Sequence, residues 1–253
     1  PADFGSLGAR PSHPQLLDWL ASEFVEHGWS LKQLHRTIMQ SAAWQEARTE
    51  PGEGPLPAAV VRLEAEAIRD RMLAVSGSLD ATLYGAPLAV KEDDTGQTVV
   101  ESGQARRSLY VQQRRSQPVG MLQAFDAPVM ETNCEARSVS TVATQSLILL
   151  NGGFILEAAA ALAERAVDLS AVVNADSVPG IDRLSSSRDP GNLQPAWVIA
   201  AWRLAYARDP RPEELEAVAL FAGKQTATLQ EVDGTVAEGR SPSRQLLVNL
   251  CQV

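Results

Sequence analysis

The stretch that decides the fold is residues 141–168, TVATQSLILLNGGFILEAAAALAERAVD. Apolar residues recur here at three- and four-residue spacing on both sides of Asn151-Gly152-Gly153. This period indicates two helices, one ending near Leu150 and one running from Phe154 to Asp168, with the glycines breaking the chain between them. The apolar run from Ser146 to Val167 is also too interrupted to suggest a membrane span.

The same helical period extends outward in both directions along the chain. The two helices of a pair are expected to begin at Ser12 and Ser30. Each serine is followed three residues later by a glutamine, which is the pattern of a capping box. Gly28 is expected to stop the first helix. Further helices are expected at residues 58–76, 197–207, from 212 and from 243, with a polar and mobile stretch at 225–241.

The region between these helical segments has a different pattern. Gly, Pro and Asp separate short β-prone runs, among them Thr98–Val100 and Ser108–Val111, with turns expected at residues 93–96 or 101–103. The sequence therefore predicts a mainly α, multi-helix fold with a small β-hairpin or short sheet insertion around residues 97–116.

The Ser/Asp/Pro/Gly-rich segment at residues 171–192 is the best candidate for an internal boundary. It divides the chain into a helical core with the β insertion at residues 1–170 and a C-terminal helical subdomain at residues 193–253, expected to pack on the first. The absence of an initiator Met and the apolar end at residues 244–253 favour a piece of a larger protein.

Composition narrows the class of function. The 253 residues carry a formal net charge of −9, with 45% hydrophobic and 21% charged residues. This balance is that of a globular domain and argues against a nucleic-acid or anionic-membrane surface over the whole chain. The sequence contains no GxSxG, HExxH, Walker A or GxGxxG motif, and three histidines leave little room for a His-rich metal site.

Cys134 and Cys251 are the only cysteines, and neither belongs to a CxxC or CxxCH motif. Two cysteines cannot complete a structural zinc site alone. They can form one disulfide in an oxidising compartment, or remain two separate buried thiols.

Arg106, Arg107, Arg114 and Arg115 bracket the apolar run around Tyr110. Pairing with the acidic excess of the chain is one interpretation. The other is a site that binds a carboxylate, sulfate or phosphate group, for which Arg106, Arg107 and Arg114 are the candidates.

A candidate catalytic set consists of His13, Arg107, Asp126, Glu131 and Arg137. Two carboxylates and an imidazole are suited to acid–base chemistry if they converge on one cleft. Nothing in their spacing fixes their separation, so capping by His13 and ion pairing by the others are the more ordinary uses of these residues.

A second charged group lies on the helix expected at residues 58–76. Arg62, Glu66, Arg69 and Asp70 are within i,i+3 and i,i+4 reach of one another on one face. We favour a structural ion-pair network for this group.

Several stretches in order along nearly the whole chain closely resemble the planctomycete-type domain of unknown function 1553. They are Pro1–Gly5, Pro11–Ala21, Gly28–Lys32, Leu34–Met39, Arg62–Asp70, Arg106–Tyr110, Phe125–Pro128, Asn151–Phe154 and Asn249–Val253.

The resemblance implies a context rather than a reaction. Such domains form the C-terminal part of large exported bacterial proteins, often behind a c-type cytochrome module with a CxxCH haem site, and carbohydrate-binding modules can accompany them. It therefore implies an extracytoplasmic location, in the periplasm or at the cell surface, where a disulfide between Cys134 and Cys251 becomes more plausible.

Two functional hypotheses follow. The first is a structural or ligand-binding module, with upstream domains of the same polypeptide and a polysaccharide as partners, and with haem c expected only in an upstream domain. The second is an enzyme, either a polysaccharide hydrolase or a redox enzyme coupled to a cytochrome domain, that uses the candidate catalytic set. Neither involves nucleic acid or membrane insertion.

Overall fold

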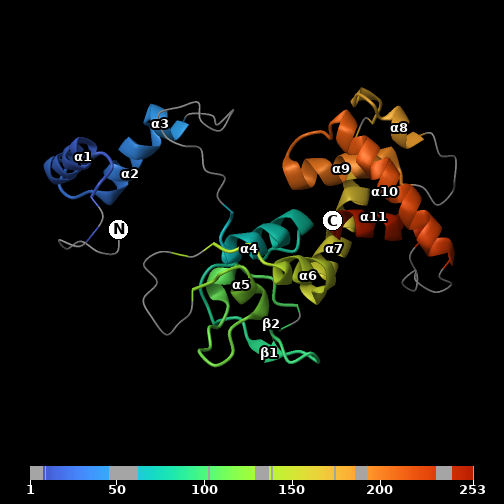
Figure 1. The fold of residues 1–253 in the computed structure, drawn as a ribbon, viewed down its shortest axis with the longest axis horizontal. Helices are drawn as coiled ribbons and strands as arrows, with labels where there is room; N and C mark the ends of the chain where they lie inside the picture. The colour runs from blue at the N-terminus through green and yellow to red at the C-terminus, as the bar shows by residue number, and fades with distance from the viewer. Residues whose placement is uncertain are drawn as a thin grey trace. The chain divides into compact units, whose positions relative to one another are not determined.

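The computed structural model describes residues 8, 10–45, 62–101, 103–128, 137, 139–173, 175–185, 193–231 and 241–252. Its contacts divide the chain into two units, residues 1–62 with 134–136, and residues 63–133 with 137–253. The fold is mainly helical with one two-stranded antiparallel hairpin in the described ranges, which confirms the predicted fold class (Figure 1).

The described part of the smaller unit contains α1 (Pro14–Glu26), α2 (Leu31–Met39) and α3 (Ala42–Gln45). None of the described residues of these helices is buried, and large apolar side chains such as Trp29 and Trp44 are about two-thirds exposed.

The predicted stop of α1 at Gly28 is confirmed, and its geometry explains it. Gly28 has φ +69° and donates its N–H to the carbonyl of Val25, while Trp29 donates to the carbonyl of Phe24 at 2.9 Å. This is the Schellman pattern, and it brings the Phe24 and Trp29 rings together with centroids 5.2 Å apart. The capping box expected at Ser12 is wrong, because His13 is the N-cap residue and its side chain caps no N–H.

The larger unit contains the remaining elements. They are α4 (Ala65–Ser76), β1 (Val90–Glu92), β2 (Thr98–Val100), the 3-10 turn η1 (Ser108–Tyr110), α5 (Gly120–Ala124), α6 (Ala143–Asn151), α7 (Gly153–Ser170), η2 (Ala175–Ser177), α8 (Asp182–Ser185), α9 (Pro195–Tyr206), α10 (Pro212–Glu231) and α11 (Pro242–Gln252).

The hairpin lies at residues 90–100, earlier in the chain than the predicted 97–116. Val90 pairs with Val100, and the turn at Asp93 is closed by its carboxylate, which accepts the N–H groups of Thr95 and Gln97 at 2.9 Å. The turn expected at residues 93–96 and the strand at Thr98–Val100 are thus confirmed.

The strand expected at Ser108–Val111 is wrong, because side chains of α4 bind the backbone there. The Asp70 carboxylate accepts the N–H of Ser108 at 2.6 Å, and the Arg69 guanidinium donates to the carbonyl of Arg106 at 3.0 Å. With these groups bound by α4, the segment forms η1, and Val111 reaches Leu88 only through an isolated bridge.

Two hydrophobic clusters fill the larger unit. One surrounds the hairpin, with Leu88, Val90, Val119, Leu122 and Phe125 among its buried side chains. The other is built from α7 and the helices after it, and Figure 1 shows α9, α10 and α11 gathered around α7.

Three alanines form the α7 face in this second cluster. Ala159, Ala163 and Ala166 are each at most 4% exposed, and they lie at three- and four-residue spacing. Because a methyl group is small, neighbouring helices approach α7 closely along this face.

Part of the expected linker at residues 171–192 is packed. Val178, Ile181 and Leu184 are buried in the α7 cluster, and the segment forms η2 and α8. The domain boundary predicted there stays a prediction. The polar stretch predicted to be mobile at 225–241 begins within α10, which continues through residue 231.

Within the described ranges, no single helix is long and apolar enough to cross a membrane. The helices α6 and α7 meet the length and composition criteria only as a pair, and the chain bends by 54° between them.

Candidate functional site

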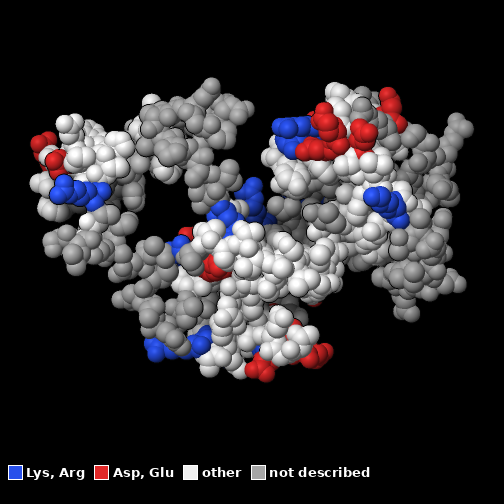
Figure 2. Space-filling model, viewed as in Figure 1, with Lys and Arg blue, Asp and Glu red and all other residues white. Residues whose placement is uncertain are grey.

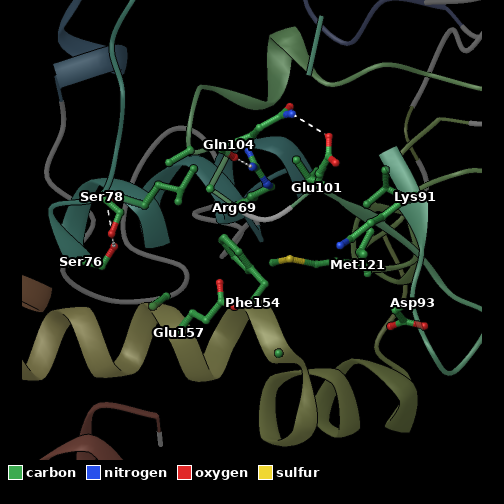
Figure 3. Close-up of a pocket in the computed structure, with 18 of the residues that line it drawn as sticks. Arg69, Ser76, Ser78, Lys91, Asp93, Glu101, Gln104, Met121, Phe154 and Glu157 are labelled. Atoms are coloured by element: carbon green, nitrogen blue, oxygen red, sulfur yellow. Dashed lines mark hydrogen bonds between the residues drawn. The ribbon is translucent and has the colours of Figure 1, made fainter. Parts of the chain in front are cut away.

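A pocket of about 520 Å³ in the larger unit is the strongest candidate site. Its walls come from α4, from the β1–β2 hairpin, from residues 103–105, from Val119 and Met121, and from the first turns of α7 (Figure 3). Volumes of this size are typical of small-molecule sites.

Arg69 and Phe154 lie on facing walls of the pocket. The Arg69 side chain is 3% exposed, and its guanidinium carbon lies 5.4 Å from the centroid of the Phe154 ring. Its amino groups donate to the carbonyls of Arg106 and Gln104 at 3.0 and 3.4 Å, and to the Ser108 hydroxyl at 3.3 Å. The segment at residues 104–108 is thereby fixed against α4.

Burial is the main influence on the Arg69 cation. Loss of hydration lowers the pKa of Arg69, and the neighbouring Asp70 carboxylate opposes this effect. Because two carbonyl oxygens and a hydroxyl of residues 104–108 accept its hydrogen bonds, Arg69 serves chiefly to hold the pocket wall.

Other polar side chains of the pocket point into the open space. In Figure 3, the Lys91 amine and the Glu157 carboxylate project toward the region around Phe154 and Met121. Both Lys91 and Glu157 are exposed, and neither has an ion-pair partner within 4.0 Å among the described residues. They are therefore available to a ligand.

An amide and a carboxylate stand at the hairpin end of the pocket. The Gln104 amide donates to the Glu101 carboxylate at 3.1 Å, and its oxygen accepts the N–H of Ala89 at 2.9 Å. Gln104 is thus fixed in orientation, and Glu101 keeps acceptor capacity for a second donor.

The charge balance of the pocket is acidic. The described part of its lining contains two cations and five carboxylates, namely Arg69 and Lys91 against Glu92, Asp93, Asp94, Glu101 and Glu157. This excess of acceptors favours ligands that donate hydrogen bonds and disfavours polyanions.

A family model described as a protein of unknown function (DUF1553), PSD1, matches residues 1–222. The chain belongs to the DUF1553 family. No curated protein and no solved structure matches it significantly. Every residue that lines the pocket of this DUF1553 chain lies within the matched range.

In the DUF1553 chain, the three arginines predicted to bind an anion, Arg106, Arg107 and Arg114, make different contacts. Arg106 donates to the carbonyls of Thr82, Tyr84 and Ala86, and its guanidinium carbon lies 3.9 Å from the centroid of the Tyr110 ring. These contacts use Arg106 to hold the loop before the hairpin.

The other two arginines of this set lie at the surface. The Arg107 Nε donates to the Asp70 carboxylate at 3.3 Å. Arg114 donates to the side-chain oxygens of Gln117 and Gln112 at 3.2 and 3.1 Å. Neither residue lines the pocket, and an anion-binding role for the set stays a prediction.

Two members of the predicted catalytic set are engaged in the larger unit. The Asp126 carboxylate accepts the N–H and the hydroxyl of Ser140, both at 2.8 Å. The Arg137 guanidinium lies 2.6 Å from the Glu66 carboxylate and 3.4 Å from that of Glu64. These contacts hold the segment before α6 and the start of α4.

His13 belongs to the smaller unit, where its Nδ1 lies 3.0 Å from the Ser12 hydroxyl. Glu131 lies outside the described residues. The convergence of the set on one cleft therefore stays a prediction.

Cys251 is packed against the α7 cluster, and burial raises the pKa of its thiol to about 12. Cys134 lies outside the described residues, so the disulfide between them also stays a prediction. Among the residues that the structure describes, no group of three or more His, Cys, Asp or Glu side chains is arranged to hold a metal ion.

Sequence reasoning missed most of this pocket. Lys91, the pair Glu101 and Gln104, and Glu157 lie in three separate segments, and no local motif joins them. The available signal was Phe154, an aromatic residue directly after Asn151-Gly152-Gly153, one of the stretches that carry the family resemblance.

Proposed function

We propose that this chain is a ligand-binding module of an exported multidomain bacterial protein and that its pocket binds a neutral saccharide. The observation that carries the proposal is the pocket itself, with an aromatic ring in its wall and side chains that donate and side chains that accept hydrogen bonds around it. A sugar hydroxyl both donates and accepts, so one ligand can satisfy Lys91, Glu101 and Glu157 together. The C–H face of a sugar ring can pack on Phe154.

The charge of the pocket selects among saccharides. Five carboxylates against two cations would repel sulfated or uronic chains, and neutral sugars carry no such penalty. A neutral saccharide is therefore preferred over a polyanionic ligand.

Binding is favoured over catalysis by the contacts of the candidate catalytic groups. Arg107, Asp126 and Arg137 each bind another part of the fold, and none of them lines the pocket. Among the described lining residues, Lys91, Asp94 and Glu157 make no ion pair and no side-chain hydrogen bond, and such groups suit recognition of hydroxyl groups.

Calorimetric titration of the full chain with neutral, uronic and sulfated oligosaccharides tests the proposal. Glu157→Gln should weaken neutral-saccharide binding about tenfold, because a charge-assisted hydrogen bond becomes a neutral one. Glu213→Gln, which changes an exposed glutamate of α10 outside the pocket, is the matched control and should bind as the parent does. Preference for a sulfated chain, or equal loss in both variants, would contradict the proposal.

The wider context is a separate part of the proposal. Membership of the DUF1553 family supports an exported protein in which another domain carries haem c and this module binds a polysaccharide. The complete reading frame should then encode a signal peptide and a CxxCH motif, and the purified full-length protein should give a haem c absorption spectrum. A frame that lacks both features would contradict this context while leaving saccharide binding testable.

A further inference from the structure

A second pocket, of about 300 Å³, lies between α7, α9, α10 and α11 and shares no residue with the first. Its walls are mainly hydrocarbon and aromatic, contributed by Leu162, Trp202, Tyr206, Val218, Phe221 and Leu250. The two pockets therefore differ in chemistry, and a proposal for the second does not rest on the function proposed for the first.

Among the described residues of the lining, Glu214 is the one that carries a charge, and it is already paired. The Glu214 carboxylate accepts both Arg208 amino groups at 2.7 and 2.6 Å, the N–H of Arg211 at 2.8 Å and the indole N–H of Trp202 at 3.2 Å. Four donors leave this carboxylate little capacity for a ligand.

Among the other described lining residues, Tyr206 carries a phenol and is 61% exposed, and Cys251 carries a thiol. The thiol is buried, and loss of hydration raises its pKa to about 12. It therefore stays neutral at ordinary pH and forms part of the apolar wall. A charged ligand would thus lose its hydration in this pocket and gain no partner.

The shape of the walls favours a flat ligand. The Trp202 and Tyr206 rings lie with centroids 5.6 Å apart and planes tilted by 43°, and Phe221 adds a third aromatic side chain. The volume is roughly twice that of an apolar cavity of about 150 Å³ that holds benzene. We propose that this pocket binds an uncharged aromatic molecule of one or two fused rings.

A protein partner fits this surface less well. A stable protein interface covers about 800 Å² on each side. Figure 2 shows charged side chains gathered over the part of the molecule where α9 and α10 lie. The ion pairs Arg203–Asp209 and Arg208–Glu214 lie there. They interrupt the apolar surface on which a protein would need to dock.

Titration of the full chain with 2-naphthol and with indole tests the proposal, followed by calorimetry and by tryptophan fluorescence. We expect saturable binding below about 1 mM, and at least tenfold weaker binding of naphthalene-2-sulfonate, which has a similar ring system and a charge. Equal affinity for the sulfonate, or no saturation by either neutral probe, would overturn the proposal.

Two variants locate the binding. Ala205→Phe fills the pocket and should abolish 2-naphthol binding, while Phe221→Leu keeps an apolar wall but removes a ring and should weaken it several-fold. Leu220→Ser, at the exposed neighbour of Phe221, is the control and should bind as the parent does. Circular dichroism identifies which variants are folded, and Phe221→Leu keeps the test decisive if Ala205→Phe does not fold.

Unchanged binding in the folded pocket variants, or equal weakening by Leu220→Ser, would place the probe elsewhere and overturn the proposal. Light scattering during the titration adds one more outcome. A monomer–dimer change that 2-naphthol reverses would identify a second copy of the chain as the occupant, and this would also overturn it.

Discussion

At the scale of single residues, the adjacent arginines Arg106 and Arg107 make very different contacts. Arg106 is half-buried and binds three carbonyl oxygens of the loop at residues 82–86, whereas the Arg107 side chain is 55% exposed and binds one carboxylate. Neighbours in sequence thus differ in their expected contribution to stability.

We expect Arg106→Ala to lower the free energy of unfolding by about 2–3 kcal/mol, because hydrogen bonds from a charged donor contribute roughly 1.5–3 kcal/mol and several are lost together. Arg107→Ala should cost less than about 1 kcal/mol, as an exposed ion pair does. Urea unfolding of both variants measures the difference. Equal losses would show that the loop contacts of Arg106 do not stabilise the fold.

A single carboxylate should give the chain a measurable acid sensitivity. Hydrogen bonds from Arg208 and from the N–H of Arg211 lower the pKa of Glu214 from 4.5 to about 2. The folded state therefore favours the ionised form, so this contribution is complete above pH 4.5 and is lost as the pH falls toward 2.

We predict that Glu214→Gln makes the decline in stability between about pH 5 and pH 2 shallower. Urea unfolding at several pH values in this range measures the slope. Glu213→Gln removes the adjacent carboxylate, outside this set of donors, and serves as the control. If Glu214→Gln leaves the dependence of stability on pH unchanged, the hydrogen bonds from Arg208, Arg211 and Trp202 do not favour the ionised carboxylate.

At the scale of elements, α4 and α7 meet at the C-terminus of α4. Arg165 of α7 donates to the last carbonyls of α4, those of Ala74 and Val75, at 3.0 and 2.7 Å. A cation at this helix end also complements the helix dipole. Gly77 ends α4 at φ +79°, with the Arg165 side chain packed over it.

Gly77→Ala and Gly96→Ala form a matched pair, because both glycines have φ +79°. Each substitution carries the left-handed backbone penalty of about 1–2 kcal/mol. Only the Cβ at residue 77 would approach another side chain, at 3.2 Å from the Arg165 Cδ, whereas nothing lies within 4 Å at residue 96. Thermal unfolding should show the greater loss for Gly77→Ala, and equal losses would mean that Arg165 moves aside freely.

The elements also show what the sequence could predict. Period and glycine placement located α6, α7 and the end of α1, because those signals are local. The Ser108–Val111 run resembled a strand, but Asp70 accepts the N–H of Ser108 and Arg69 donates to the carbonyl of Arg106 just before the run. Both of these α4 residues lie nearly forty residues earlier in the chain. The pocket was missed for the same reason, since its groups converge only through tertiary packing.

At the scale of the whole molecule, the two units differ in how much they bury. The described helices of the smaller unit contain no buried residue, whereas the larger unit contains both hydrophobic clusters. Burial is the main source of helix stability in proteins. The two units should therefore differ in resistance to local unfolding.

Native-state hydrogen exchange of the full chain checks this expectation. Amides of α1 and α2 should exchange through openings of low free energy, while those of α7, α9 and α11 should approach the value for global unfolding. A fragment of residues 63–253 should keep the same protection in α7. Protection of α1 equal to that of α7 would mean that the smaller unit is stabilised by contacts beyond those described.

The alanine face of α7 has a consequence for how this chain can vary. Ala159, Ala163 and Ala166 lie where other helices already touch, so each position is limited by space rather than by polarity. Even one added methylene there typically costs 1–3 kcal/mol. Sequence divergence along this face should therefore be confined to glycine, alanine and serine. A larger residue would require a smaller side chain at the position of α9 or α11 that it contacts.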